Sequence, residues 1–212
     1  MWRLLAPILL VLATVGGRAS AAEFAVSVKD QKGQPAGDAV VSLWPVERER
    51  AIPATPGATH VIDQSHEAFI PFVTVMQRGD AIRFKNSDRT RHHVYSFSSV
   101  RQFELVLNPG ESSPAVKFDQ SGVAAIGCNI HDKMLAYAFV TDTPWAARTD
   151  AQGRATLSNV PGGKYRAEVW HPRMDVDRPT AGQTVSAQAS SDVAFSVQLN
   201  PPVQAGSHRR HY

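Results

Sequence analysis

Short runs in which apolar and polar residues alternate make up most of the chain. Residues 24–29 (FAVSVK) alternate and end at the turn-forming residues 30–33, and residues 81–85 (AIRFK) alternate and end at residues 86–88 (NSD). Alternation with a period of two is typical of half-buried β-strands, and Asn, Asp, Gly and Pro favour turns. Because long helical periodicity is missing, the sequence predicts an all-β protein built from β-sandwiches.

Further runs of the same kind predict the remaining strands. A charged and then Pro-rich segment at residues 47–59 interrupts them and is expected to be a loop. Residues 201–212 lack an apolar pattern, so we expect a flexible tail there. The additional strands are expected at residues 39–44, 69–76, 92–97, 102–107, 115–118, 123–126, 135–141, 154–157 and 165–170, with one or two more within 184–199.

The N-terminal segment has the parts of a secretory signal peptide. A short basic start that includes Arg3 precedes the apolar residues 4–15, and the small residues 19–21 (ASA) follow. The apolar stretch is too short to span a bilayer comfortably, and the small residues suit a signal peptidase. We therefore expect residues 1–22 to be a signal peptide and the mature chain to be periplasmic or secreted, without a membrane span. An uncleaved membrane anchor is the alternative.

Composition and charge narrow the functional classes. Of the 212 residues, 43% are apolar and 19% are charged, which excludes a disordered polyelectrolyte. Without Arg3 and Arg18 of the signal peptide, 22 − 2 = 20 basic residues face 19 acidic ones, so electrostatics give no reason to expect a nucleic-acid partner. The single cysteine, Cys128, excludes an intrachain disulfide and any zinc site built on two or more thiolates.

The candidate chemistry lies around that cysteine. Cys128, His131 and Met134 place a thiolate, an imidazole and a thioether in one short loop between two predicted strands. These soft and borderline ligands suit copper rather than magnesium or calcium. A trigonal copper site needs a second imidazole from another strand, and His92, with His93 beside it, lies 128 − 92 = 36 positions earlier. The alternative is a buried inert cysteine, a core methionine and two surface histidines.

Such a ligand set serves electron transfer. Cu(II) prefers tetragonal geometry and hard ligands, whereas Cu(I) prefers few and soft ligands. A rigid plane of two imidazoles and one thiolate, with a weak axial thioether, suits both oxidation states. Little has to rearrange when one electron moves, so the transfer can be fast.

Residues 66–142 resemble a cupredoxin, the blue-copper domain of the plastocyanin and amicyanin type. Residues 83–94 (RFKNSDRTRHHV) are similar to the family's strand, Asn/Asp turn and first histidine, and residues 128–140 (CNIHDKMLAYAFV) to its ligand loop and last strand. The resemblance implies a Greek-key β-sandwich that holds one type 1 copper ion. Carried over by position, the ligands are His92 and His131 as imidazoles, Cys128 as the thiolate and Met134 as the axial thioether.

Three residues depart from the family pattern. His93 stands where Asn is usual, and because neighbours on a strand face opposite sides, only one of His92 and His93 can ligate in regular geometry. We favour His92 as the ligand; His93 is then either a donor that ties the Cys128 loop or a surface residue. Ile130 replaces the usual Pro, and its free N–H is a candidate donor to the thiolate. Gly127 and its small neighbours stand where an aromatic residue would provide an electron pathway.

The two flanks of this segment resemble parts of a second domain. Residues 24–43 are similar to the start of a carboxypeptidase regulatory-like (transthyretin-like) sandwich, and residues 149–169 to its continuation. We therefore expect a smaller, discontinuous sandwich at residues 23–62 and 143–200, with the cupredoxin domain (66–142) inserted in it. The alternative assigns the N-terminal strand pair to the cupredoxin and makes the C-terminal part a separate domain.

The leading interpretation is an exported copper protein that carries single electrons and is not an enzyme. A protein redox partner is then implied, docking at the exposed edge near His131. The whole pattern also resembles exported methylamine-utilisation or plastocyanin-like proteins. Alternatives are a copper-binding or copper-tolerance protein without electron transfer, a metal-free adhesion or scaffold module, and a copper enzyme; the last needs paired histidines, and the sequence has no His-x-His pair.

Overall fold

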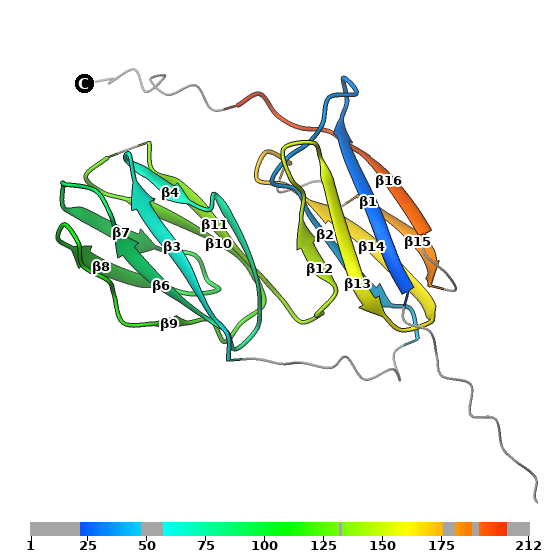
Figure 1. The fold of residues 1–212 in the computed structure, drawn as a ribbon, viewed down its shortest axis with the longest axis horizontal. Helices are drawn as coiled ribbons and strands as arrows, with labels where there is room; N and C mark the ends of the chain where they lie inside the picture. Colours follow the sequence, from blue (N-terminus) through cyan, green and yellow to red (C-terminus); the bar gives the residue numbers. More distant parts are fainter. Residues whose placement is uncertain (1–21, 48–56, 132, 176–180, 188–190, 203–212) are drawn as a thin grey trace, which may run out of the picture.

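The structure is a computed structural model that describes residues 22–47, 57–131, 133–175, 181–187 and 191–202 (Figure 1). Strands, turns and loops make up these residues, so the predicted all-β class is confirmed. None of them belongs to a helix that is long and apolar enough to cross a membrane. The predicted signal peptide, apart from Ala22, and the tail from residue 203 onward lie outside the described residues.

The described strands form four sheets. The strands are β1 (Ala22–Asp30), β2 (Val40–Pro45), β3 (Thr59–Ser65), β4 (Ala68–Ile70), β5 (Val73–Gln77), β6 (Ala81–Asn86), β7 (His92–Ser96), β8 (Phe103–Leu107), β9 (Val116–Lys117), β10 (Gly122–Cys128), β11 (Leu135–Thr141), β12 (Ala146–Arg148), β13 (Arg154–Val160), β14 (Gly163–Trp170), β15 (Ala181–Ala187) and β16 (Ser191–Val197). Sheets β13-β1-β16 and β12-β2-β14-β15 share one buried apolar cluster, which we call the first sandwich. Sheets β5-β11-β10-β7-β8 and β4-β3-β6-β9 share another, which we call the second sandwich.

The first sandwich joins the two ends of the described chain. β1 lies between β13, which it pairs in the antiparallel sense, and β16, which it pairs in the parallel sense. The alternation seen in the sequence directs Phe24, Val26 and Val28 inward, where each is at most 3% exposed. Residues from both flanks of the chain therefore bury each other, and in Figure 1 this sandwich lies beside the second one.

The second sandwich contains the segment that carries the candidate ligands. Phe84, Phe118 and Ile126 are fully buried in its cluster. β10 is central to this arrangement because it pairs in the antiparallel sense with both β7 and β11. The residues before and after the cysteine loop are thus held by neighbouring strands of one sheet.

Two sequence-based boundaries differ from the structure. The expected limit of the first domain at residue 62 falls inside β3, because β3 pairs in parallel with β6 and Ile62 is buried in the second cluster. The single strand expected at 69–76 is two strands, β4 and β5, which belong to different sheets. Pro71, which has no N–H to donate to a ladder, lies between them. The likeness of the first sandwich to a transthyretin-like domain stays a prediction.

An aromatic contact links the two sandwiches. Trp170, at the end of β14, packs against Tyr137 and Phe139 of β11, with ring centroids 5.7 Å and 5.4 Å apart. The connecting segment adds a buried hydrogen bond, in which the Thr143 hydroxyl donates to the carbonyl of Leu43 at 2.7 Å. Trp170 therefore fills the junction between the sandwiches, in agreement with the packing role that such a residue most often has.

Candidate metal centre

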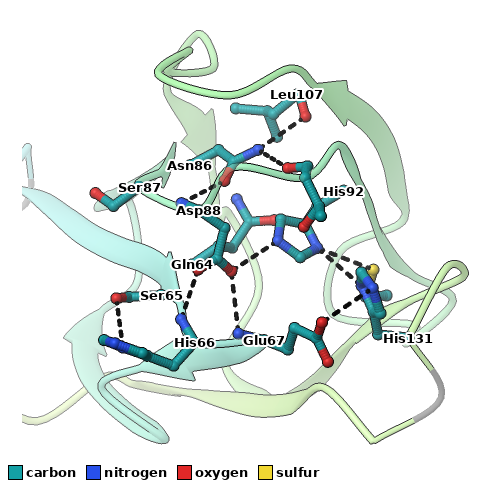
Figure 2. A network of polar contacts seen from close by, with 12 residues as sticks. Gln64, Ser65, His66, Glu67, Asn86, Ser87, Asp88, His92, Leu107 and His131 are labelled. Atoms are coloured by element: carbon teal, nitrogen blue, oxygen red, sulfur yellow. Dashed lines mark hydrogen bonds and ion pairs between the residues drawn. The ribbon is translucent and has the colours of Figure 1, made fainter.

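The structure brings His92, Cys128 and His131 together. Ligand atoms of these three side chains all lie within 4.8 Å of one another. The Nδ1 atom of His92 lies 3.7 Å from the Cys128 Sγ atom and 3.3 Å from the Nδ1 atom of His131. These are three of the four residues that the sequence predicts as copper ligands, and they come from β7, from β10 and from the loop that follows β10. Figure 2 shows the contact between the His92 and His131 rings.

Strand pairing explains why His92 and Cys128 meet. Cys128 lies opposite Val94 in the antiparallel register of β7 and β10. Side chains two positions apart on a strand share a face, so His92 lies on the inner face with Val94 and next to the thiol. His92 is fully buried, and Cys128 is 4% exposed. Two of the candidate ligands are therefore fixed by a sheet rather than by a free loop.

A carboxylate fixes the orientation of the His92 ring. The Nε2 atom of His92 lies 2.9 Å from the Oδ2 atom of Asp88 (Figure 2). An ionised carboxylate only accepts hydrogen bonds, so Nε2 is the protonated nitrogen and Nδ1 carries the free lone pair. That lone pair is directed at Cys128 and His131. A histidine held from behind by a carboxylate is the usual arrangement of a metal ligand.

Asp88 is itself held ionised by its surroundings. Burial opposes its ionisation, but hydrogen bonds from the Glu67 N–H, the His92 ring and the His66 N–H outweigh burial and hold the pKa of Asp88 below its ordinary value of 3.8. The two backbone donors lie 3.0 Å and 2.6 Å from its oxygens. The buried Asn86 adds support, because its Oδ1 atom accepts from the Asp88 N–H at 3.0 Å.

The turn between β3 and β4 reaches the same site. Its two central residues, His66 and Glu67, have φ values of 56° and 54°, which is the left-handed conformation that a two-residue hairpin turn of this kind requires. Asp88 accepts both of their N–H groups and so stabilises this costly backbone. The Glu67 carboxylate then lies 3.6 Å from the Nε2 atom of His131. Neither His66 nor Glu67 is among the site residues predicted from the sequence.

The convergence of the two imidazoles favours a bound cation. Each ring has its outer nitrogen next to a carboxylate, Asp88 for His92 and Glu67 for His131. The two inner Nδ1 atoms lie only 3.3 Å apart, with a thiol beside them. Two lone pairs at this distance repel each other unless a proton or a metal ion lies between them. Two imidazoles and a thiolate are donors that suit copper, so the residues present fit the implied metal.

His93 is directed away from this cluster. Its Nε2 atom lies 2.6 Å from Glu104 on β8. The expected tie to the Cys128 loop exists, but the main chain makes it: the His93 carbonyl accepts from the Asn129 N–H at 3.0 Å. The idea that the His93 side chain provides this tie is therefore wrong, because its ring lies on the other face of the strand.

Met134 closes the ligand loop from inside the protein. It is 3% exposed, belongs to the same buried cluster as Cys128, and donates its N–H to the His131 carbonyl at 3.0 Å. The structure thus gives it a buried place next to a ligand. Its role as the axial ligand stays a prediction, as does the hydrogen bond from the Ile130 N–H to the thiolate.

Comparisons with known proteins give likenesses in structure only. No protein-family model matches the chain, and no curated protein sequence is significantly similar to it. Among solved structures, amicyanin from Paracoccus versutus is 13% identical over 48% of this chain and 97% of its own, with a TM-score of 0.36. A purple cupredoxin from Nitrosopumilus maritimus is 18% identical over 39% of this chain and 99% of its own, with a TM-score of 0.35.

A third similar structure is part of a larger protein. The copper-containing nitrite reductase from Thermus scotoductus is 22% identical over 46% of this chain but only 25% of its own, with a TM-score of 0.35. At such identities the likeness concerns the fold alone. Each of these likenesses covers less than half of this chain.

Proposed function

We propose that this protein is an exported mononuclear type 1 copper protein that carries single electrons between redox partners and transforms no substrate. The observation that carries the proposal is the convergence of His92, Cys128 and His131, whose ligand atoms lie within 4.8 Å of one another. The lone cysteine of the chain lies at this one place, buried and without a disulfide partner.

The residues that would hold copper are His92 and His131 through Nδ1, Cys128 through Sγ and Met134 through its thioether sulfur. When bound, copper supplies a one-electron couple, and the thiolate gives it a strong absorption in the visible range. Among these ligands the two on the sheet cannot move far, because they are buried on neighbouring strands. That rigidity supports fast electron transfer, since the ligands need not rearrange between the two oxidation states.

Two carboxylates beside the proposed histidine ligands orient the imidazole rings. Asp88 keeps the Nε2 proton of His92 and leaves Nδ1 free to bind metal. Glu67 takes the corresponding position at the outer nitrogen of His131, but at 3.6 Å and on a side chain that is 61% exposed. His131 is therefore the less constrained ligand, and its 22% exposed ring is the edge where we propose that a protein partner docks.

The two-domain organisation belongs to the same proposal. Two separate buried clusters support a discontinuous outer sandwich around an inserted cupredoxin domain. The flanking residues 22–45 and 145–199 contribute to the first cluster, while residues 62–140 contribute to the second. Insertion of this kind is tolerated when the two ends of the inserted domain lie close together.

A visible spectrum of the copper-loaded mature protein tests the proposal. We expect an intense thiolate-to-Cu(II) band, with one copper ion per chain. The Cys128→Ser and His92→Ala variants should lose the band, whereas the matched His93→Ala variant should keep it, because the His93 ring lies on the opposite face with Glu104. Loss of the band in His93→Ala but not in His92→Ala would refute the ligand assignment.

Redox kinetics separate an electron carrier from a copper-holding protein. Fast self-exchange between reduced and oxidised protein would support the carrier. Tight retention of Cu(I) with slow oxidation would instead indicate that the protein holds copper without passing electrons. Absence of bound copper after reconstitution would contradict both functions.

A further inference from the structure

An aromatic pair lies beside the candidate thiolate, on the outer face of the five-stranded sheet. In the register of β7 and β10, Tyr95 lies opposite Gly127, the residue that precedes Cys128. The rings of Tyr95 and Phe97 have centroids 5.0 Å apart and planes inclined by 37°. Phe97 is 74% exposed, more than any other large apolar side chain in the described part of the chain. Single exposed apolar side chains are common on protein surfaces, so what marks Phe97 is its ring contact with Tyr95 beside the strand that carries the cysteine.

Gly127 allows the Tyr95 ring to lie directly on the backbone. A Cβ atom at position 127 would lie 2.9 Å from both Cζ and Oη of Tyr95, a distance that real Cβ atoms essentially never show. The φ angle of Gly127 is not positive, so the backbone conformation does not require glycine at this position. Glycine inside a strand often marks a close approach of another group, and here that group is an aromatic ring.

We infer that Tyr95 and Phe97 form a second electron-exchange site, an inference that rests on the proposed function. The route runs from Cys128 Sγ through the main chain to Gly127, across the contact with the Tyr95 ring, and through Phe97 to the surface. With copper bound, one electron would pass along this route from Cu(I) to a one-electron oxidant at Phe97, which would leave Cu(II) and the reduced oxidant. No bond forms or breaks and no proton moves, because the rings only couple donor and acceptor.

The surroundings of the aromatic pair indicate what kind of partner it fits. Glu104, which lies opposite Tyr95 on β8, has its carboxylate 2.6 Å from the His93 ring. Both edges therefore carry an exposed carboxylate beside a histidine, Glu104 at the aromatic site and Glu67 at His131, and what distinguishes the aromatic site is the exposed apolar ring of Phe97. A redox protein whose redox group lies behind an apolar surface fits the Tyr95–Phe97 site.

The outer face of the same sheet forms an apolar interface at another strand, β11. On β11 it presents Tyr137 and Phe139, and these two rings are covered by Trp170 of the first sandwich. The part that carries Phe97 continues this face across β10 and β7. At β11 the face thus accepts an aromatic group from another domain, and we assign the part at β7, which carries Phe97, to the redox partner.

Intramolecular electron transfer tests the route. A thiol-reactive, photoactive ruthenium complex is attached to the copper-loaded Phe97→Cys variant, in which copper protects Cys128, and flash photolysis gives the transfer rate. Adding Tyr95→Leu should lower this rate about tenfold, which corresponds to about 1.4 kcal/mol of activation free energy. The matched control carries the complex at Val106→Cys, because Val106 is 56% exposed on β8 and lies opposite His93 rather than Tyr95. There, Tyr95→Leu should leave the rate unchanged.

Bimolecular oxidation by ferricenium, a one-electron oxidant whose two rings present apolar surfaces, tests the contact surface. We expect the Phe97→Ser variant to be oxidised more slowly than the natural protein, and the Val106→Ser variant to be oxidised at the natural rate. Equal rates for all three proteins would overturn the assignment of a contact site to Phe97.

The visible spectrum separates this inference from the proposed function. If no variant shows the thiolate-to-copper band, the proposed function fails. If the band is intact in the Tyr95→Leu background but the rate from position 97 does not change, only the electron-exchange site is refuted. An equal loss of rate from positions 97 and 106 would also refute it, because that loss would reflect a general change at the copper site.

Discussion

Replacing Asp88 by asparagine tests how the protein prepares His92 to bind metal. In the structure the Asp88 carboxylate accepts from the His92 Nε2–H at 2.9 Å. Asparagine has nearly the same shape, but it offers an NH₂ group that donates where the second carboxylate oxygen accepted. If the NH₂ group faces His92, Nε2 must become an acceptor and the proton moves to Nδ1. The lone pair that is directed at Cys128 is then lost.

The structure sets the size of the expected effect. Hydrogen-bond partners behind a metal ligand typically contribute about 10–100-fold to metal affinity, or about 1.4–2.7 kcal/mol. We expect Asp88→Asn to fall in this range because Asp88 is only 14% exposed and its contact with His92 lies on the buried side. The metal-free protein also loses one charge-assisted hydrogen bond, which lowers its free energy of unfolding by about 1–2 kcal/mol.

Copper affinity and the histidine tautomer are the two measurements. Competition titration with a chelator gives the affinity, and long-range ¹H–¹⁵N correlation spectra show which ring nitrogen of His92 carries the proton. The control is Asp119→Asn, which removes the same charge at a side chain that is 62% exposed and paired with Lys117. If Asp88→Asn keeps both the natural affinity and the Nε2–H tautomer, the carboxylate does not orient the ligand and the reasoning fails.

Three further substitutions test the packing and the electrostatics. Asp80→Asn should lower the free energy of unfolding by about 2–3 kcal/mol at neutral pH, because Asp80 is buried and accepts hydrogen bonds from four donors, including His60. Burial alone would raise the pKa of Asp80, but these hydrogen bonds hold it below its ordinary value. Gly127→Ala should lower the free energy of unfolding by about 1–3 kcal/mol, because the added methyl group overpacks against Tyr95. In the double variant, Tyr95→Leu should restore part of this lost stability. Trp170→Ala should lower the free energy of unfolding by about 2 kcal/mol. In calorimetry, the two sandwiches of this variant should then melt in separate transitions.

Each of these has its own contradicting result. A carboxyl group whose pKa is lowered by folding stabilises the fold above its unfolded pKa, and the effect is lost as the pH falls through the folded value. The difference between the natural protein and Asp80→Asn in chemical denaturation should therefore shrink below pH 3.8, and a constant difference would contradict it. Additive costs for positions 95 and 127 would mean that they do not interact. A single unchanged calorimetric transition in Trp170→Ala would mean that this contact does not couple the sandwiches.

Strands and ligands were predictable because they depend on local patterns. The alternation in residues 24–29 and 81–85 is observed as β1 and β6, with the apolar positions buried. Alternation predicted that only one of His92 and His93 can face inward, whereas the choice of His92 came from its match to the position of the first histidine in the cupredoxin pattern. The break at Pro71 was missed, since an apolar run resembles one strand until its two halves are assigned to different sheets.

The residues that support the ligands were less predictable. Asp88 precedes His92 by four residues, so the sequence contains a signal for it, but that signal does not show that a carboxylate oxygen contacts Nε2. Glu67 has no signal at all. It reaches His131 only because β3 pairs with both β4 and β6, which carries the hairpin turn to the ligand loop.

The sequence by itself determined the all-β class, the residue types of the candidate ligands and the placement of His92 and His93 on opposite faces of β7. These follow from residue chemistry and from the two-residue period of a strand, which act over a few neighbouring positions. Only the tertiary structure decided that Asp88 and Glu67 lie behind the two imidazoles, that the Tyr95 ring covers Gly127, and that Trp170 joins the sandwiches. Contacts between distant segments depend on sheet order and register, and no local pattern of residues encodes those.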